Sequence, residues 1–388
     1  MLTAARSSHC RVCKAGSLTA VVDLGAKAGA ASSPADSSED PERRRRASTL
    51  PLAPALHLCS SCGLLQLKHA SQFRPPSDYR SGVSSTARAH LQALNEEIRG
   101  KVPLAAGDSV LDIGSNDATF LRFYPEDLRR IGCDFAGKQF AGCYAGLEHV
   151  PDYFTKEGLS AGLGGKTPRL KVVSSIAVFN DVPDPVLFAS DVASVLDDEG
   201  VWALEQSYVL TMLQRNSIDT ICHEHLEYYG VRQIKAIMDR AGLKIIDVST
   251  NDCNGGSFRI YVAKKASTQH AEAVDAIAAF LQREAEAGLD KPDTYRRFLS
   301  GCDAEVAKLT AFLDAAAASG KRVQIYGAST KGNCLLQYAG IDSAKITYAV
   351  ERNLDKVQWA RSGRALAWTC GSIVLNQPRR AQRLGPRL

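Results

Sequence analysis

Residues 108–121, DSVLDIGSNDATFL, place a short apolar run directly before a turn that contains one glycine, Gly114. Such a run ending at a glycine is typical of a strand that enters a tight turn, and we expect a helix beyond it. Three similar runs follow at 129–134, 170–176 and 200–206. The stretch therefore predicts the first strand of a sheet built from several such units.

Helical patterns lie between and after these strands. We expect helices at 185–196 and 231–243, strands at 244–249 and 256–264, and an Ala-rich helical region at 268–319. A second strand, glycine turn and helix are expected from RVQIYGASTKGN, residues 322–333. Alternation of strands and helices predicts an α/β fold with a doubly wound, mostly parallel sheet.

Composition narrows the class of protein. The chain has 388 residues, of which 45% are hydrophobic and 23% charged, as in a globular protein of two or three domains. The net charge of +5 is mild, and no basic stripe alternates with aromatics, so we expect no nucleic-acid partner. We also expect no membrane span, because no run of about 18 apolar residues occurs. With no apolar signal core at the N-terminus, we expect a cytoplasmic protein whose 11 cysteines are ligands or buried thiols.

Two Cys-x-x-Cys pairs stand near the N-terminus, Cys10 with Cys13 and Cys59 with Cys62. Four thiolates from two such pairs give the closed tetrahedral geometry of structural Zn²⁺. A glycine directly after Cys62 eases a tight turn there. Redox-active or unpaired thiols are the alternative, although no thioredoxin-like unit surrounds either pair.

The turn after residue 113 also suggests a ligand. Dinucleotide sites use Gly-x-Gly-x-x-Gly around a pyrophosphate, but this turn has one glycine and two acids, Asp112 and Asp117. Acids suit a cationic or zwitterionic ligand such as S-adenosylmethionine, and Asp134, 22 residues after Asp112, stands where doubly wound folds bind ribose. A plain turn with a capping Asp is the alternative. The candidate cofactor-binding residues are Asp112, Gly114, Ser115, Asn116, Asp117 and Asp134.

Residues 222–229, CHEHLEYY, carry two histidines around a glutamate. His223 and His225 are two apart, so a helix would not stack them on one face as a zinc protease requires. On a loop, a lone histidine is more often a structural hydrogen-bond partner than a base, and the tyrosines more often pack than react. The residues alone leave both roles open.

Taken together, the motifs resemble the S-adenosylmethionine-dependent sugar C-methyltransferases of deoxysugar biosynthesis. The matching segments are the paired Cys-x-x-Cys, YRSGVSST (79–86), VLDIGSNDATFL (110–121), VPDYF (150–154), LEQSY (204–208), DTICHEHLEYY (219–229), NGGSFRIYVAK (254–264) and YGASTKGN (326–333). The resemblance implies a zinc-bearing lobe at 1–75, a methyltransferase core at 76–265, and a helical linker with a Rossmann-like lobe at 266–388.

The resemblance also implies roles. His225 would be the base that deprotonates the carbon next to a sugar ketone, with Glu224 as its neighbour and Tyr79 beside the enolate. Lys331, Asn333 and Tyr228 would bind the substrate, a nucleotide-linked keto sugar for which we expect thymidine diphosphate. The implied cofactors are S-adenosylmethionine and structural Zn²⁺, and we expect a monomer.

Three departures from the family pattern stand out. Ala118 replaces a usual glycine and would be strained at positive φ. Asn180 replaces an aromatic or histidine. The tail after about residue 357 diverges. One alternative to a C-methyltransferase is therefore a non-catalytic relative that its tail has disabled. The other alternative is a nicotinamide-dependent sugar-nucleotide oxidoreductase with two Rossmann-like units.

Overall fold

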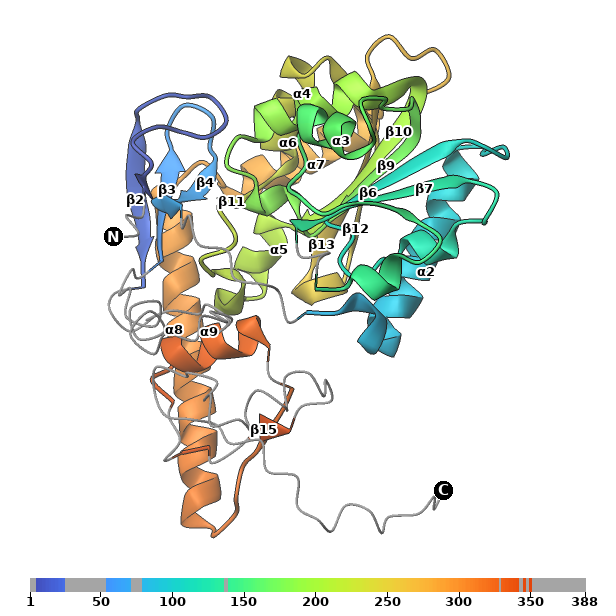
Figure 1. Ribbon diagram of the computed structural model, residues 1–388. Coiled ribbons are helices and arrows are strands. Elements are labelled where there is room, and N and C mark those ends of the chain that lie inside the picture. Colours follow the sequence, from blue (N-terminus) through green and yellow to red (C-terminus); the bar gives the residue numbers. More distant parts are fainter. Residues whose placement is uncertain are drawn as a thin grey trace, which may run out of the picture.

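The computed structural model describes residues 5–24, 54–70, 79–135, 139–327, 329–341, 345–346 and 349–350. Its largest sheet has seven strands in the order β12-β13-β10-β9-β6-β7-β8 (Figure 1). They are β6 (Ser109–Ile113), β7 (Arg129–Cys133), β8 (Glu148–Val150), β9 (Leu170–Ile176), β10 (Leu196–Ser207), β12 (Leu243–Asn251) and β13 (Ser257–Lys264). The strands from β6 to β10 are parallel, and β13 runs antiparallel to both β10 and β12. The predicted mostly parallel, doubly wound sheet is confirmed.

Helices cover both faces of this sheet. Figure 1 shows α2 (Ser85–Lys101) on one face and α3 (Lys156–Gly162), α4 (Pro185–Val195) and α6 (Val231–Arg240) on the other. Alternating residues of β10 divide between the two cores: Ala203 packs with α2, whereas Trp202 and Leu204 pack with α4 and α6. This alternation follows from the period of two along a strand.

The order in which strands are added to the sheet reverses at β6: β7 and β8 lie on one side of it, and β9 and β10 lie on the other. In open α/β sheets, ligands bind outside the carboxyl ends of the strands at such a switch point. The turn at Gly114 therefore opens onto the expected ligand crevice.

The helix expected directly beyond this turn is wrong. Only a short 3-10 helix, Leu121–Phe123, lies between β6 and β7. Asn116 and Ala118 take φ values of 52° and 58°, so the backbone is left-handed where a helix would have to start. The α2 helix, which precedes β6, fills that face instead.

A smaller sheet forms near the N-terminus in the order β11-β4-β3-β2. Its strands are β2 (Leu18–Asp23), β3 (Ala55–Cys59), β4 (Leu65–Leu67) and β11 (Glu227–Tyr228), and a separate pair joins β1 (Ala5–Arg6) to β5 (His69–Ala70). Strand β11 belongs to the CHEHLEYY stretch, so the middle of the chain completes an N-terminal sheet. The boundaries at residues 75 and 265 stay predictions.

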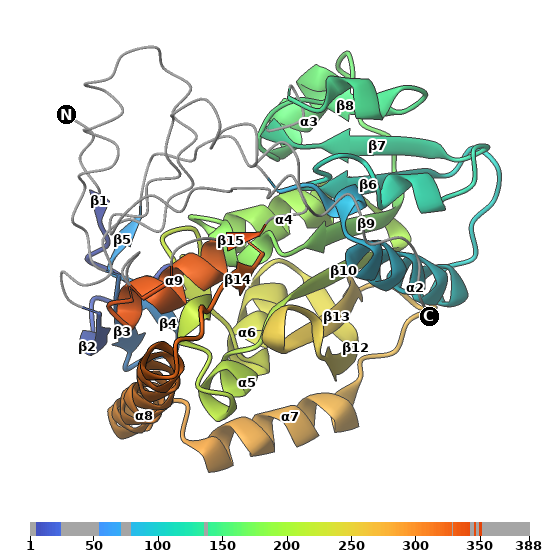
Figure 2. The same cartoon turned by 90° about the horizontal axis from the view of Figure 1, so that it is seen from below.

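Helix α5 (Val209–Gln214) follows β10 within the core. The C-terminal part begins with α7 (Val274–Ala287) and continues through the long α8 (Pro292–Ala318), which packs against β2. The expected second strand, turn and helix are present as β14 (Ile325–Tyr326), paired in parallel with β15 (Ala349–Val350), and α9 (Thr330–Tyr338). Figure 2 shows α9 beside the N-terminal sheet. The divergent tail after residue 357 lies outside the described residues.

Across the described part of the chain, no helix combines the length and apolarity needed to cross a membrane. A cytoplasmic location stays a prediction.

Candidate active site

The turn after β6 requires glycine at its first position. Gly114 has φ +74°, and a Cβ there would lie 2.3 Å from Cγ2 of Val178, which follows β9. Two residues further on, the Asn116 N–H donates to Oδ2 of Asp134 at 2.8 Å. Tyr144 donates from its hydroxyl to the Asn116 carbonyl at 2.8 Å. These contacts fix the turn against the carboxyl ends of β7 and β9.

Asp112 and Asp134 occupy different environments. The Asp112 carboxyl is buried in the sheet and accepts a hydrogen bond of 2.6 Å from the Ser174 hydroxyl on β9. Burial raises the pKa of Asp112 to about 7. Asp134 lies just past the end of β7, where it receives the Asn116 N–H. Ser115 lies between them and shares a 2.8 Å hydrogen bond with the Tyr144 hydroxyl.

The side chains of Asn116 and Asp117 hold the YRSGVSST segment. Asn116 Nδ2 donates to the Tyr79 carbonyl at 2.8 Å, and its Oδ1 accepts from the Ser81 N–H at 3.1 Å. Asp117 Oδ2 accepts from the Gly82 N–H at 3.1 Å, and a Cβ on Gly82 would lie 2.9 Å from that oxygen. The segment is thereby fastened to the turn, which brings Tyr79 to the edge of the crevice.

Ala118, at the end of this turn, has the positive φ at which the sequence analysis expected strain. Its φ of 58° is unfavourable for an alanine, and its side chain is fully buried. The strain expected from the missing glycine is therefore present.

The CHEHLEYY stretch is a loop held from two sides. Its Leu226 N–H donates to the Asn180 carbonyl at 2.7 Å, next to the end of β9. On the other side, Arg11, in the turn between Cys10 and Cys13, donates to the Leu226 carbonyl at 3.1 Å and lies 3.3 Å from the Glu227 carboxylate. The loop therefore has a defined position relative to both the crevice and the cysteine-bearing part.

His225 makes the contact that matters most in this loop. Its Nδ1 lies 2.8 Å from the Thr220 carbonyl oxygen. Because a carbonyl can only accept, Nδ1 carries the hydrogen, and in the neutral ring Nε2 then carries a lone pair. Glu224 is half-buried beside it, and the ring of Tyr228 lies edge-on to His225 with centroids 6.4 Å apart. The arrangement is suitable for accepting a proton at Nε2.

Comparison with known proteins identifies the family. Residues 85–248 match the family described as a methyltransferase domain, and residues 252–369 match the C-methyltransferase C-terminal domain. These matches show that the chain is an S-adenosylmethionine-dependent C-methyltransferase. The alternative of a nicotinamide-dependent oxidoreductase is therefore wrong, because both matched family models describe methyltransferases.

Among curated proteins, the C-methyltransferase NovU of Streptomyces niveus is 28% identical over 305 residues, which are 77% of this chain and 72% of the relative. Among solved structures, a chain of the complex between the Trm112 methyltransferase activator of Haloferax volcanii and a methyltransferase is 16% identical, with a TM-score of 0.36 over 47% of this chain and 96% of that one. A S-adenosylmethionine-dependent methyltransferase of Clostridium acetobutylicum is 10% identical, with a TM-score of 0.34 over 48% and 93%.

The four cysteines of the C-methyltransferase come together as the sequence predicted. Sγ of Cys10 lies 3.5 Å from that of Cys62, and Sγ of Cys13 lies 3.5 Å from that of Cys59. All four sulfurs lie within 4.8 Å of one another, an arrangement that could hold a metal ion. Gly63, at φ +73°, makes the turn that the sequence anticipated after the second pair.

The α9 helix carries Lys331 and Asn333, which the sequence analysis expects to bind the nucleotide. Lys331 Nζ donates to the Asn254 carbonyl and lies 3.8 Å from Oδ2 of Asp219, so it links α9 to two loops of the core. Asn333 is half-buried on the same helix. The Ser329 hydroxyl caps this helix by accepting from the Gly332 N–H at 3.0 Å.

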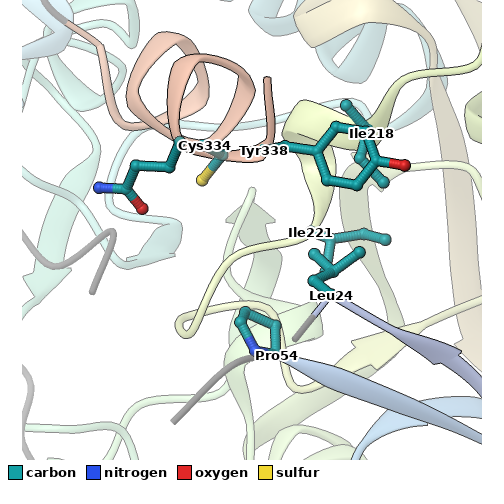
Figure 3. Close-up of a pocket in the computed structure, with 7 residues that line it drawn as sticks. Leu24, Pro54, Ile218, Ile221, Cys334 and Tyr338 are labelled. Atoms are coloured by element: carbon teal, nitrogen blue, oxygen red, sulfur yellow. The ribbon is translucent and has the colours of Figure 1, made fainter. Parts of the chain in front are cut away.

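A small apolar pocket lies where α9 meets the core and the N-terminal sheet (Figure 3). It is lined by Leu24, Pro54, Ile218, Ile221, Cys334, Gln337 and Tyr338. The volume open to the centre of a water molecule is about 10 Å³, room for about one water. This pocket is too small to bind a sugar nucleotide.

Sequence reasoning missed one cluster of charged side chains near the crevice. Glu205 at the carboxyl end of β10 contacts His90 of α2 and Arg259 of β13, and Cys253 lies close by. The available signal was the pair of family motifs LEQSY and NGGSFRIYVAK, which contain Glu205 and Arg259, and the second of which begins directly after Cys253. Nothing in the spacing of the residues showed that α2 would bring His90 to them.

Proposed function

We propose that this C-methyltransferase transfers a methyl group to the carbon next to the ketone of a nucleotide-linked deoxysugar. The observation that carries the proposal is the hydrogen bond between His225 Nδ1 and the Thr220 carbonyl, which directs the basic lone pair to Nε2. A carbon acid beside a ketone is the substrate that needs such a base, because carbon must become nucleophilic before it is methylated.

His225 would remove the proton from this carbon, while the carbonyl oxygen takes up the negative charge. Thr220 orients the imidazole and keeps it in the required tautomer. Tyr79 would lie beside the developing enolate oxygen, since its segment is fastened to the turn by Asn116. Glu224 would stabilise the imidazolium that forms. Tyr228, edge-on to His225, would limit the orientation of the sugar ring.

S-adenosylmethionine supplies the methyl group as a sulfonium. We propose that it binds at the switch point, with Asp134 at the ribose and the backbone around Gly114 and Ser115 close to the adenosyl moiety. The acids fit a cationic ligand. Asp112, buried and bonded to Ser174, would act mainly by shaping the turn, and the side chains of Asn116 and Asp117 by holding the segment that carries Tyr79.

The nucleotide part of the acceptor, for which we propose thymidine diphosphate, would bind at the N-terminal end of α9. Lys331 offers a positive charge for the diphosphate, and Asn333 offers an amide from the same helix. The enzyme would act as a monomer.

We further propose that Cys10, Cys13, Cys59 and Cys62 hold one structural Zn²⁺. The fit rests on four sulfurs within 4.8 Å of one another, a closed donor set that zinc favours. Because β11 pairs with β4 of the same sheet, the metal would also support the loop that carries His225.

Mass spectrometry after incubation with S-adenosylmethionine and a thymidine diphosphate keto sugar tests the proposal. The expected product carries one added methyl group on a ring carbon. Product methylated on oxygen or nitrogen, or methylation only of acceptors without a ketone, would contradict it.

A further inference from the structure

A pair of hydrogen-bonded charged groups lies close to Tyr79. Nε2 of His90 lies 2.6 Å from Oε1 of Glu205. The other oxygen of this carboxylate accepts from Arg259 Nε and from Asn251 Nδ2, each at 2.8 Å. Since Glu205 is 3% exposed, the carboxylate is held almost entirely by protein donors. These hydrogen bonds fix the orientation of the Glu205 carboxylate, and the carboxylate in turn fixes the orientation of the His90 ring.

His90, Glu205 and Cys253 have ligating atoms within 4.8 Å of one another, which are residue types that bind metals. The contact at 2.6 Å argues against a metal here, because a hydrogen must lie between the ring and the carboxylate at that distance. Arg259 adds a positive charge at the same carboxylate. The cluster therefore holds a proton more readily than a divalent cation.

The ring is protonated at neutral pH. Contacts with the Cys253 thiol and with the Glu205 carboxylate raise the pKa of His90 to about 10. Behind Glu205, Arg259 is in turn paired with Glu97 of α2. Because Nε2–H is given to Glu205, the imidazolium has Nδ1–H as its second donor, and Cys253 is the other hydrogen-bond partner of the ring. The His90 side chain is 23% exposed, so a ligand can approach it.

The cluster lies at the carboxyl end of β10, on the side of the sheet where the ligand is expected. The Ala177 N–H, just past β9, donates to the Glu205 carbonyl at 2.7 Å, so the ends of β9 and β10 are joined there. Burial chiefly raises the pKa of Tyr79, and the charge of Cys253 adds to it, which places Cys253 near both Tyr79 and His90. Tyr79 and His90 therefore both lie near Cys253, beside the carboxyl end of β10.

We propose that His90 is a second catalytic residue, which donates its Nδ1–H, together with the Tyr79 hydroxyl, to the acceptor's carbonyl oxygen as that oxygen becomes negative. This inference rests on the proposed function. The carbon gives its proton to His225, the electron pair of that C–H bond forms the enolate double bond, and the carbonyl π electrons move to oxygen. His90 keeps its proton throughout. When the carbon attacks the methyl group, the enolate electrons form the new C–C bond and the carbonyl returns, while the methyl–sulfur bond breaks and its electron pair stays on the sulfur of the donor. Glu205 is a positioning residue that fixes the ring.

The first test is kinetic. In His90→Gln we expect kcat for methylation to fall about 10²–10³-fold, the usual loss for one oxyanion donor. The affinity for S-adenosylmethionine should stay unchanged. His270→Gln is the matched control, because this histidine lies at the opposite end of β10, 3.3 Å from the Glu199 carbonyl, and it should keep wild-type kcat.

Rescue by imidazole separates a catalytic from a structural role. Added imidazole should restore part of kcat to His90→Ala, and the rescue should be lost as the imidazole deprotonates above pH 7. A His90→Gln variant that folds and methylates at the wild-type rate would overturn the inference, as would imidazole that gives no rescue to a folded His90→Ala.

The second test does not depend on the acceptor. NMR titration of the full-length wild type should show the His90 ring still protonated at pH 8.5, and Glu205→Gln should lower its pKa. A His90 ring that titrates near its ordinary value of 6.5 overturns the inference whatever the substrate. A wild type that fails to methylate any keto sugar, with His90 still protonated, instead contradicts the proposed function.

Discussion

Gly114→Ala, in the turn after β6, should lower the free energy of unfolding far more than an ordinary replacement of glycine. The alanine would have to keep the left-handed backbone conformation of Gly114, at φ +74°. Its Cβ would lie 2.3 Å from Cγ2 of Val178. The left-handed conformation costs a non-glycine residue about 1–2 kcal/mol. Overpacking a well-packed site costs about 1–3 kcal/mol more. The free energy of unfolding should therefore fall by about 2–5 kcal/mol.

Gly107→Ala is the control for this variant. Gly107 also has positive φ, at +87°, but no atom lies within 4 Å of a Cβ built there. It should lose only the backbone part, about 1–2 kcal/mol. Urea unfolding of both variants measures the difference, and calorimetry with S-adenosylmethionine should show weaker binding for Gly114→Ala alone. Equal losses of stability and equal affinities in the two variants would refute the packing of the turn against Val178.

Three further outcomes are expected. Asp134→Ala should weaken binding of S-adenosylmethionine by about 1.5–3 kcal/mol, as for a bond to a charged group, and unchanged affinity by calorimetry would remove Asp134 from the cofactor site. Burial raises the pKa of the Asp112 carboxyl from 3.8 to about 7, so between these pH values the folded protein binds more protons than the unfolded chain. The stability that Asp112 contributes is therefore present below about pH 4 and is lost as the pH rises through about 7. Asp112→Asn should flatten this dependence of the free energy of unfolding on pH in urea unfolding, and an unchanged dependence would be contrary evidence. Cys62→Ser should lose the metal, lower the melting temperature and reduce kcat through the β11 loop, and metal analysis that finds no zinc in folded wild type would dismiss the zinc site.

The sequence predicted features that depend on local patterns. The strand before Gly114 was visible because apolar residues run directly into a glycine. The cysteine cluster was visible because two close pairs supply a complete donor set. The helix expected after the turn was wrong because the left-handed backbone at Asn116 and Ala118 excludes a helix start there, and the possible positive φ at Ala118 was interpreted only as local strain.

Features that depend on distant contacts could not be predicted. The pairing of Glu227 with Gln66 joins segments far apart in the chain, and two residues of strand are too few to show a period. The contact between His90 and Glu205 likewise depends on how α2 packs beside β10. In both cases the tertiary fold, and no local propensity, decides which side chains meet.

Exchange of the acidic hydrogen tests the central claim most directly. A thymidine diphosphate keto sugar is incubated in heavy water with enzyme but without S-adenosylmethionine, and mass spectrometry follows deuterium at the carbon beside the ketone. Wild type should exchange this hydrogen, and His225→Asn should be slower by about 10²–10⁴-fold, the usual contribution of a general base. Exchange by His225→Asn at the wild-type rate would show that another group removes the proton and would contradict the account.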